Sequence, residues 1–120
     1  MRLPVVLLVL SLIVSPDSQA VASSTALTNE TVTRAIKTWE RQQLQTCPNL
    51  HVTYIGRPYQ GWVRSSSNCG KPDVSDNEFL HFALGRWSVA CSHGDDVMDV
   101  SSAARKCSMP PAVARKLGLR

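Results

Sequence analysis

Cysteine content constrains this chain more than any other feature of its sequence. The chain has 120 residues and four cysteines, namely Cys47, Cys69, Cys91 and Cys107. None belongs to a Cys-x-x-Cys pair, the spacing that redox sites and zinc knuckles usually need. An even number of cysteines in a small exported chain predicts two disulfide bonds. Three pairings are open, and we favour Cys47–Cys69 with Cys91–Cys107 because each would tie together the ends of a hairpin region.

The amino terminus indicates that the chain is exported. Arg2 precedes an apolar run over residues 5–14, and small or polar residues follow this run. This pattern is typical of a secretory signal peptide. We therefore predict a signal peptide at residues 1–20, with cleavage after Ala20 or after Ala22. The apolar run is shorter than the roughly 20 residues that cross a bilayer as a helix, so we expect no membrane span. The expected location is extracellular, or periplasmic if the source is bacterial.

One small domain is expected to follow the signal peptide. Residues 21–27 lack periodicity and predict a flexible lead-in, so we place the domain at residues 28–120. The chain has a net charge of +4. The signal peptide holds one residue of each sign, so the mature domain keeps this mild excess. A domain of this size buries only about two-thirds of the surface of its unfolded chain, so disulfides are expected to supply much of its stability.

An amino-terminal helix is indicated by apolar residues at helical spacing. These residues are Val32, Ala35, Ile36 and Trp39. Thr28 or Asn29 can cap the helix, which we expect to end near Gln45. The apolar stripe should pack on a sheet, with Trp39 as its largest anchor.

Two strands joined by a hairpin loop are predicted next. Residues 50–55 alternate with a period of two, which predicts a strand with two different faces. One face would carry Leu50, Val52 and Tyr54. Ile55 would lie on the opposite face. The segment Gly56–Gly61 is bracketed by glycines and predicts the hairpin loop, with a second strand from Trp62. The serines at residues 65–67 weaken the pattern of that strand.

The stretch over residues 75–84 allows two interpretations. Phe79, His81 and Ala83 alternate in it as residues on one face of a strand do. However, Ser75-x-x-Glu78 is a capping box, and Gly85 is a suitable residue for ending a helix. We favour a short helix here.

Strand, turn and helix patterns follow each other to the end of the chain. Residues 86–91 predict a strand, one face of which would carry Trp87, Val89 and Cys91. Turn residues fill 92–96, and residues 97–100 can pair back as a final strand. Two prolines open a last helical turn over residues 112–117.

The expected fold class is α+β. We predict a small disulfide-stabilised domain in which an N-terminal helix packs on a short antiparallel sheet. A helix followed by a sheet and two disulfides is similar to the plan of cystatins. The chain lacks the Gln-x-Val-x-Gly hairpin sequence of that family and distributes its cysteines differently, so we assign no family.

A group of three carboxylates and one imidazole near the end of the predicted sheet is a candidate metal site. The group consists of His93, Asp95, Asp96 and Asp99. Its spacing matches no calcium loop, because the glycine and glutamate that an EF-hand needs are not at their places. Aspartate and glycine are also ordinary turn residues, so we interpret the group as a solvated turn and expect no metal.

Acid and base catalysis has candidate residues but no motif. The candidates are His51, His81, His93 and Glu78, which could act in a hydrolase of the ribonuclease type if they met in space. The sequence contains no nucleophile elbow, no zinc-protease motif and no phosphate-binding loop. We therefore expect no enzymatic activity and no cofactor.

The preferred contact surface is the predicted hairpin loop. Arg57, Tyr59 and Trp62 combine a cation with aromatic rings, and such side chains dominate the energetics of protein interfaces. Alternatively, Tyr59 and Trp62 simply cover the sheet. Asn29 begins a glycosylation sequon, Asn29-Glu30-Thr31, which is meaningful only in a eukaryotic secretory route.

Basic residues are concentrated at the carboxyl end, after the last acidic residue, Asp99. They are Arg105, Lys106, Arg115, Lys116 and Arg120. Such a basic tail could attract an anionic surface, or it could serve only solubility. Five charges without interleaved aromatic residues are too few for a nucleic-acid-binding domain, so we do not expect a nucleic-acid partner.

The function predicted from the sequence is that of a secreted, non-enzymatic binding protein. It would act like an effector or toxin on an extracellular or host protein or on an anionic surface. The ribonuclease-type hydrolase is one alternative. A structural protein associated with the cell envelope is another.

Overall fold

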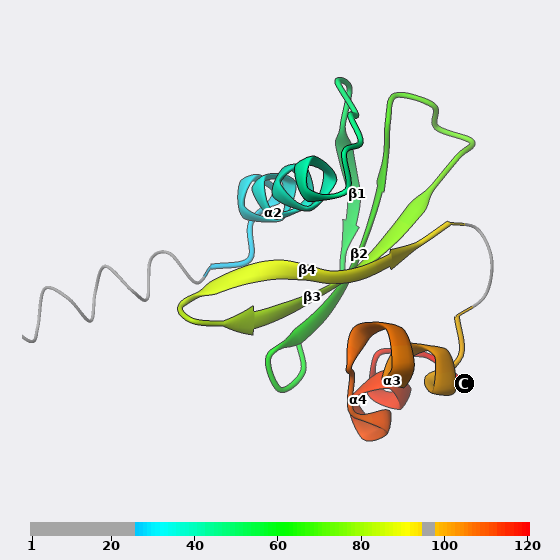
Figure 1. Cartoon of the computed structure of the whole chain (residues 1–120). Coiled ribbons are helices and arrows are strands. Elements are labelled where there is room, and N and C mark those ends of the chain that lie inside the picture. The colour runs from blue at the N-terminus through cyan, green and yellow to red at the C-terminus, as the bar shows by residue number, and fades with distance from the viewer. Residues whose placement is uncertain (1–25, 95–97) are drawn as a thin grey trace, which may run out of the picture.

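The structure, a computed structural model, describes residues 26–94 and 98–120 (Figure 1). Its elements are α2 (Asn29–Gln42), β1 (His51–Ile55), β2 (Trp62–Asn68), β3 (Asp76–Ala83), β4 (Arg86–His93), α3 (Val100–Cys107) and α4 (Pro111–Lys116). The strands form one antiparallel sheet in the order β1-β2-β3-β4. The predicted α+β class is therefore confirmed. The predicted signal peptide and most of the lead-in lie outside the described residues.

Helix α2 begins where the sequence predicted. The Thr28 hydroxyl accepts a hydrogen bond from the Thr31 backbone N–H at 3.1 Å, which is the geometry of an N-cap. The helix ends slightly earlier than expected. Leu44 adopts a positive φ of 57°, and the Gln45 N–H bonds back to the Glu40 carbonyl at 2.8 Å. A left-handed residue just past a helix is a usual way to end it.

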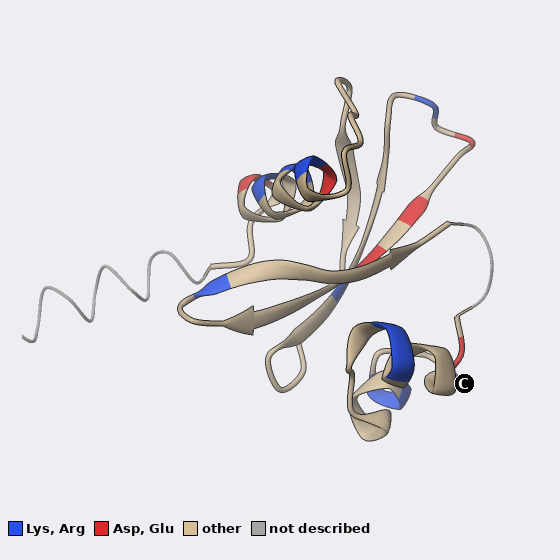
Figure 2. Ribbon diagram, viewed as in Figure 1, with Lys and Arg blue, Asp and Glu red and all other residues tan. Residues whose placement is uncertain are grey.

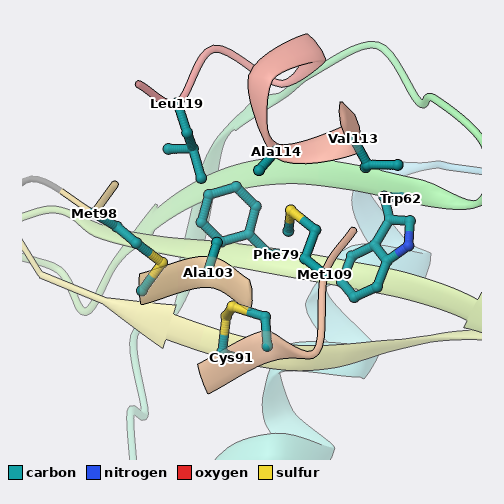
Figure 3. Packing of buried hydrophobic residues seen from close by; sticks show 10 residues of the cluster. Trp62, Phe79, Cys91, Met98, Ala103, Met109, Val113, Ala114 and Leu119 are labelled. Atoms are coloured by element: carbon teal, nitrogen blue, oxygen red, sulfur yellow. A yellow bond between two sulfur atoms is a disulfide. The ribbon is translucent and has the colours of Figure 1, made fainter. Parts of the chain in front are cut away.

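Helices cover both faces of the sheet (Figure 1). Helix α2 lies on one face and shares an apolar cluster with it, which we call the α2-face cluster. Its buried members are Val32, Ala35, Ile36, Val63, Leu80 and Val89. Helices α3 and α4 lie on the other face and share the α3–α4-face cluster (Figure 3). Its buried members are Trp62, Phe79, Cys91, Met98, Ala103, Cys107, Met109, Val113, Ala114 and Leu119.

Most of the stretch over residues 75–84 forms strand β3 (Asp76–Ala83), so the prediction of a short helix is wrong. The strand pairs with β2 on one side and with β4 on the other. Phe79 and Leu80 are both fully buried, in different clusters on opposite faces. Burial on both faces hides the simple alternation by which a strand is recognised. Gly85, with Leu84, forms the tight turn of the β3–β4 hairpin, in which both residues have positive φ.

Two β-bulges correct the predicted strand faces. In β1 the register shifts between Val52 and Tyr54, so Ile55 packs against the α2-face cluster and Tyr54 is 55% exposed. In β4, Phe79 pairs with Cys91 while Leu80 pairs with Val89. Ala90 is therefore an extra residue, and it places Val89 and Cys91 on opposite faces. The predicted common face of Tyr54 with Val52, and of Cys91 with Val89, is wrong for this reason.

The carboxyl end is helical where a strand was expected. Val100 begins α3 instead of ending a strand, and residues 95–97 lie outside the described residues. The Asp99 carboxylate accepts a hydrogen bond from the Ser102 N–H at 2.7 Å and thereby caps α3. The predicted last helix is confirmed as α4. The basic residues expected in a tail lie largely on these two helices.

Both favoured disulfides are present. Cys47–Cys69 joins the ends of the β1–β2 hairpin, and Cys91–Cys107 joins β4 to the end of α3. The Cα–Cα distances are 5.3 and 5.2 Å, within the usual range for a disulfide. No helix in the described part of the chain has the length and apolar character needed to cross a membrane.

Candidate functional site

A carboxylic acid is buried between α2 and the sheet. Glu78 is only 2% exposed, and it lies beside two buried serines of the neighbouring strand. The Ser65 hydroxyl donates to its Oε1 at 2.7 Å, and the Ser67 hydroxyl donates to its Oε2 at 2.6 Å. Two of the three serines that weakened the sequence pattern of β2 are therefore the partners of this acid.

The surroundings of Glu78 raise its pKa, so the carboxyl group keeps its proton up to about neutral pH. Burial raises the pKa of Glu78 from 4.5 to about 7, and the two serine hydrogen bonds oppose this rise. The carboxylates of Asp76 and Glu40 raise the pKa further. Glu40 is affected in the same direction, because burial and then Asp76 raise its pKa, although Lys37 lowers it.

The acid opens onto a small pocket of about 270 Å³. The pocket is lined by Ile36, Trp39, Glu40, Gln45, Ser67, Asp76, Glu78, Ser92, His93 and Gly94. Three carboxyl groups and an imidazole therefore share one site, in which a proton could be exchanged near neutral pH. We call it the Glu78 pocket.

The three predicted histidines do not meet in one place. Among the described residues that line the Glu78 pocket, His93 is the one histidine. Its ring also stacks on Phe79, with 5.8 Å between ring centroids. His81 stacks on Trp62 at 4.3 Å, on the face covered by α3 and α4. His51 is exposed on the edge strand β1.

The predicted contact loop lies against the carboxyl-terminal helices. Its tip is a tight turn in which Gln60 and Gly61 both have positive φ and Tyr59 forms a bridge with Trp62. Tyr59 packs against the α3–α4-face cluster, and the Lys116 Nζ lies 5.6 Å from the centroid of its ring. In Figure 1 the loop between β1 and β2 lies on the side of α4.

The three predicted contact residues differ in exposure. Arg57 is exposed and Tyr59 is half-buried, whereas Trp62 is 5% exposed. Trp62 is therefore part of the core next to the loop, whereas Arg57 and Tyr59 are accessible. The binding role of all three residues stays a prediction.

The basic residues of the carboxyl end are exposed on a folded scaffold. Arg105 and Lys106 lie in the last turn of α3, and Arg115 and Lys116 in the last turn of α4. All four are exposed, as is Arg120. Figure 2 shows these cations on both helices and no acidic residue on either. We call these five cations, with Arg57 and Tyr59 of the adjoining loop, the basic surface.

The other predicted sites are only partly described. Asp95 and Asp96 lie outside the described residues, and Asp99 serves as a helix cap. Asn29, the sequon residue, is exposed in the first turn of α2, and its glycosylation stays a prediction. Glu40 lies close to the sulfurs of Cys47 and Cys69, but these are paired in a disulfide and offer no thiolate to a metal.

Comparison of the chain with known protein families, with curated proteins and with solved structures finds no match.

Proposed function

We propose that the protein is an exported, non-enzymatic binding protein that recognises an anionic extracellular or host macromolecule through the basic surface. The observation that supports this most is the contact of Lys116 with the Tyr59 ring. It joins the aromatic contact loop to the basic helix α4, and the sequence had presented the loop and the basic residues as separate candidates. Cations beside aromatic rings are a combination that protein interfaces favour.

The scaffold is suited to presenting these charges. The disulfide from Cys91 holds α3 on the sheet at Cys107, and the inner sides of α3 and α4 are buried in the α3–α4-face cluster. Side chains on a rigid support lose less conformational entropy on binding than side chains on a flexible tail.

The proposal is tested by retention on immobilised heparin, a polyanion, in a rising salt gradient. The double substitution Arg115→Ala and Lys116→Ala should elute at clearly lower salt than the natural domain, because each lost contact removes counterion release. A matched control replaces Lys37 and Lys71 by alanine, since they lie on α2 and on the β2–β3 connection. If both double variants shift equally, net charge alone acts and the proposal fails.

A hydrolase of the ribonuclease type is the second candidate. It is favoured by one observation: Glu78, with a pKa of about 7, lines the same pocket as His93. Acid–base catalysts work best when their pKa lies near the working pH. Hydrolysis of RNA that is lost in both Glu78→Gln and His93→Ala would establish this function. RNA left intact by the natural domain, or cleaved equally by both variants, would exclude it.

A further inference from the structure

A second cavity lies between the outer part of α2 and the start of β4, and no function discussed above uses it. Its volume is about 400 Å³, within the range of pockets that bind small molecules. It is lined by Thr31, Arg34, Ala35, Thr38, Trp39, Gln42, Gly85, Arg86, Trp87, Ser88 and Val89. We call it the Trp39–Trp87 cleft.

The cleft has two aromatic walls that are held in place by packing. Trp39 and Trp87 are both half-buried and pack against the α2-face cluster. Trp87 is also tilted against Phe82 of the paired strand, with 5.4 Å between ring centroids. Fixed indole rings offer an apolar surface to a flat ring at little entropic cost.

The cleft also has two cations and, among the described residues that line it, no acid. Arg34 of α2 and Arg86 of β4 are both exposed. Arg34 forms an ion pair with Glu30 at 2.8 Å, and this glutamate is outside the cleft lining. Within residues 26–94 and 98–120, no acidic side chain forms an ion pair with Arg86. Its guanidinium can therefore bind an external anion.

Arg86 is placed by a rigid turn. It directly follows Leu84 and Gly85, which both have positive φ, and it pairs with Ala83 across the hairpin. Such a two-residue turn fixes the path of the strand that leaves it. The backbone of Arg86 is thus held beside the cleft, and its exposed side chain can reach an anion bound there.

We propose that the Trp39–Trp87 cleft binds a small anionic aromatic molecule, in which a flat ring carries a phosphate or sulfate group. The ring lies between the indoles, and the anionic group bonds to Arg86 with help from Arg34. The cleft is lined by α2 and β4, and the basic surface by α3, α4 and the Gly56–Gly61 loop. This inference therefore stands independently of the proposed function.

The test is a titration of the domain with two probes, AMP and p-nitrophenyl sulfate, with adenosine as the uncharged control. Binding is followed by the indole N–H signals in an NMR spectrum. Saturable shifts of the Trp39 and Trp87 signals are expected, while Trp62, buried on the other face, should not move. A saturable response to either probe supports the proposal. Absence of saturable shifts with both, or equal binding of adenosine and AMP, overturns the proposal.

Matched variants identify the anion partner. Arg86→Gln should weaken binding of the responding probe about tenfold, the usual effect of losing a hydrogen bond to a charged group. Lys71→Gln makes the same change of charge on the β2–β3 connection, outside the cleft and the basic surface, and should leave the affinity unchanged. Equal weakening in both variants would show that only net charge matters and would overturn the assignment of Arg86.

Discussion

The two faces of the sheet are built on different principles. The face under α3 and α4 is closed by a large apolar cluster of ten buried residues and is crossed by a disulfide. The face under α2 has six buried apolar residues and, beside them, an acid with two serines. The first face thus serves stability, whereas the second includes polar groups that a core of this size would exclude if stability were its sole role.

The largest expected effect concerns the disulfide of the α3–α4 face. The double substitution Cys91→Ala and Cys107→Ala should lower the free energy of unfolding by about 4–5 kcal/mol, at the upper end for a native disulfide. Removing Cys47–Cys69 in the same way should cost about 2–3 kcal/mol. Loop length favours the opposite order, but only by about 0.3 kcal/mol. Burial decides, because Cys91 and Cys107 belong to the apolar cluster while Cys69 is exposed.

Urea unfolding of the two double variants measures this difference. An equal loss of stability would mean that the two bridges act only on the unfolded chain. The contrast between the faces would then not extend to their disulfides.

The next effect concerns the pH dependence that Glu78 gives to the α2 face. Its pKa is about 7 in the fold against an ordinary value of 4.5, so the folded protein holds a proton that the unfolded chain has released. Stability from this group is therefore complete below pH 4.5 and is lost as the pH rises to about 7. The loss amounts to about 3 kcal/mol.

Urea unfolding between pH 4 and 8 tests this expectation. Glu78→Gln keeps the size of the side chain and cannot ionise, so it should remove most of the slope. Glu30→Gln removes an exposed, ion-paired carboxylate on α2 and should leave the pH dependence unchanged. If the free energy of unfolding of Glu78→Gln still fell with pH as in the natural domain, the proton would belong to another group.

The smallest expected effect tests the bulge in β1. Ile55→Ala should cost about 1–2 kcal/mol, because Ile55 packs against the α2-face cluster. Tyr54→Ala should cost less than about 0.5 kcal/mol, because its ring is largely exposed. Thermal unfolding of the two variants distinguishes them. A larger loss for Tyr54→Ala than for Ile55→Ala would mean that Tyr54, and not Ile55, packs on the α2 face, as the sequence predicted.

Local signals in the sequence were sufficient for some elements. The cap at Thr28, the glycine-bracketed loop and the prolines before α4 act through neighbouring atoms, and the structure confirms all three. The capping box at Ser75 had the same local form but lost to pairing with two strands. An extra residue such as Ala90 leaves no sign in composition, so the faces beyond it could not be assigned.

The candidate sites depended even more on distant contacts. Glu78 was a candidate only in the alternative hydrolase interpretation, and nothing in the sequence connects it with Ser65 and Ser67, which reach it only through strand pairing. A polar run inside an otherwise strand-like segment was the one available signal. The Trp39–Trp87 cleft is lined by residues almost fifty positions apart, and no sequence motif indicates it.

The extra residue in β4 also governs the covalent chemistry of the chain. Because β4 is bulged at Ala90, Cys91 lies on the opposite face from Val89, where it faces α3 and bonds to Cys107. If Ala90 occupied a regular strand position instead of a bulge, Cys91 would share the face of Val89 and its thiol would point toward α2, away from Cys107. The irregular pairing at Ala90, and not the cysteine spacing alone, is therefore what brings the two sulfurs together.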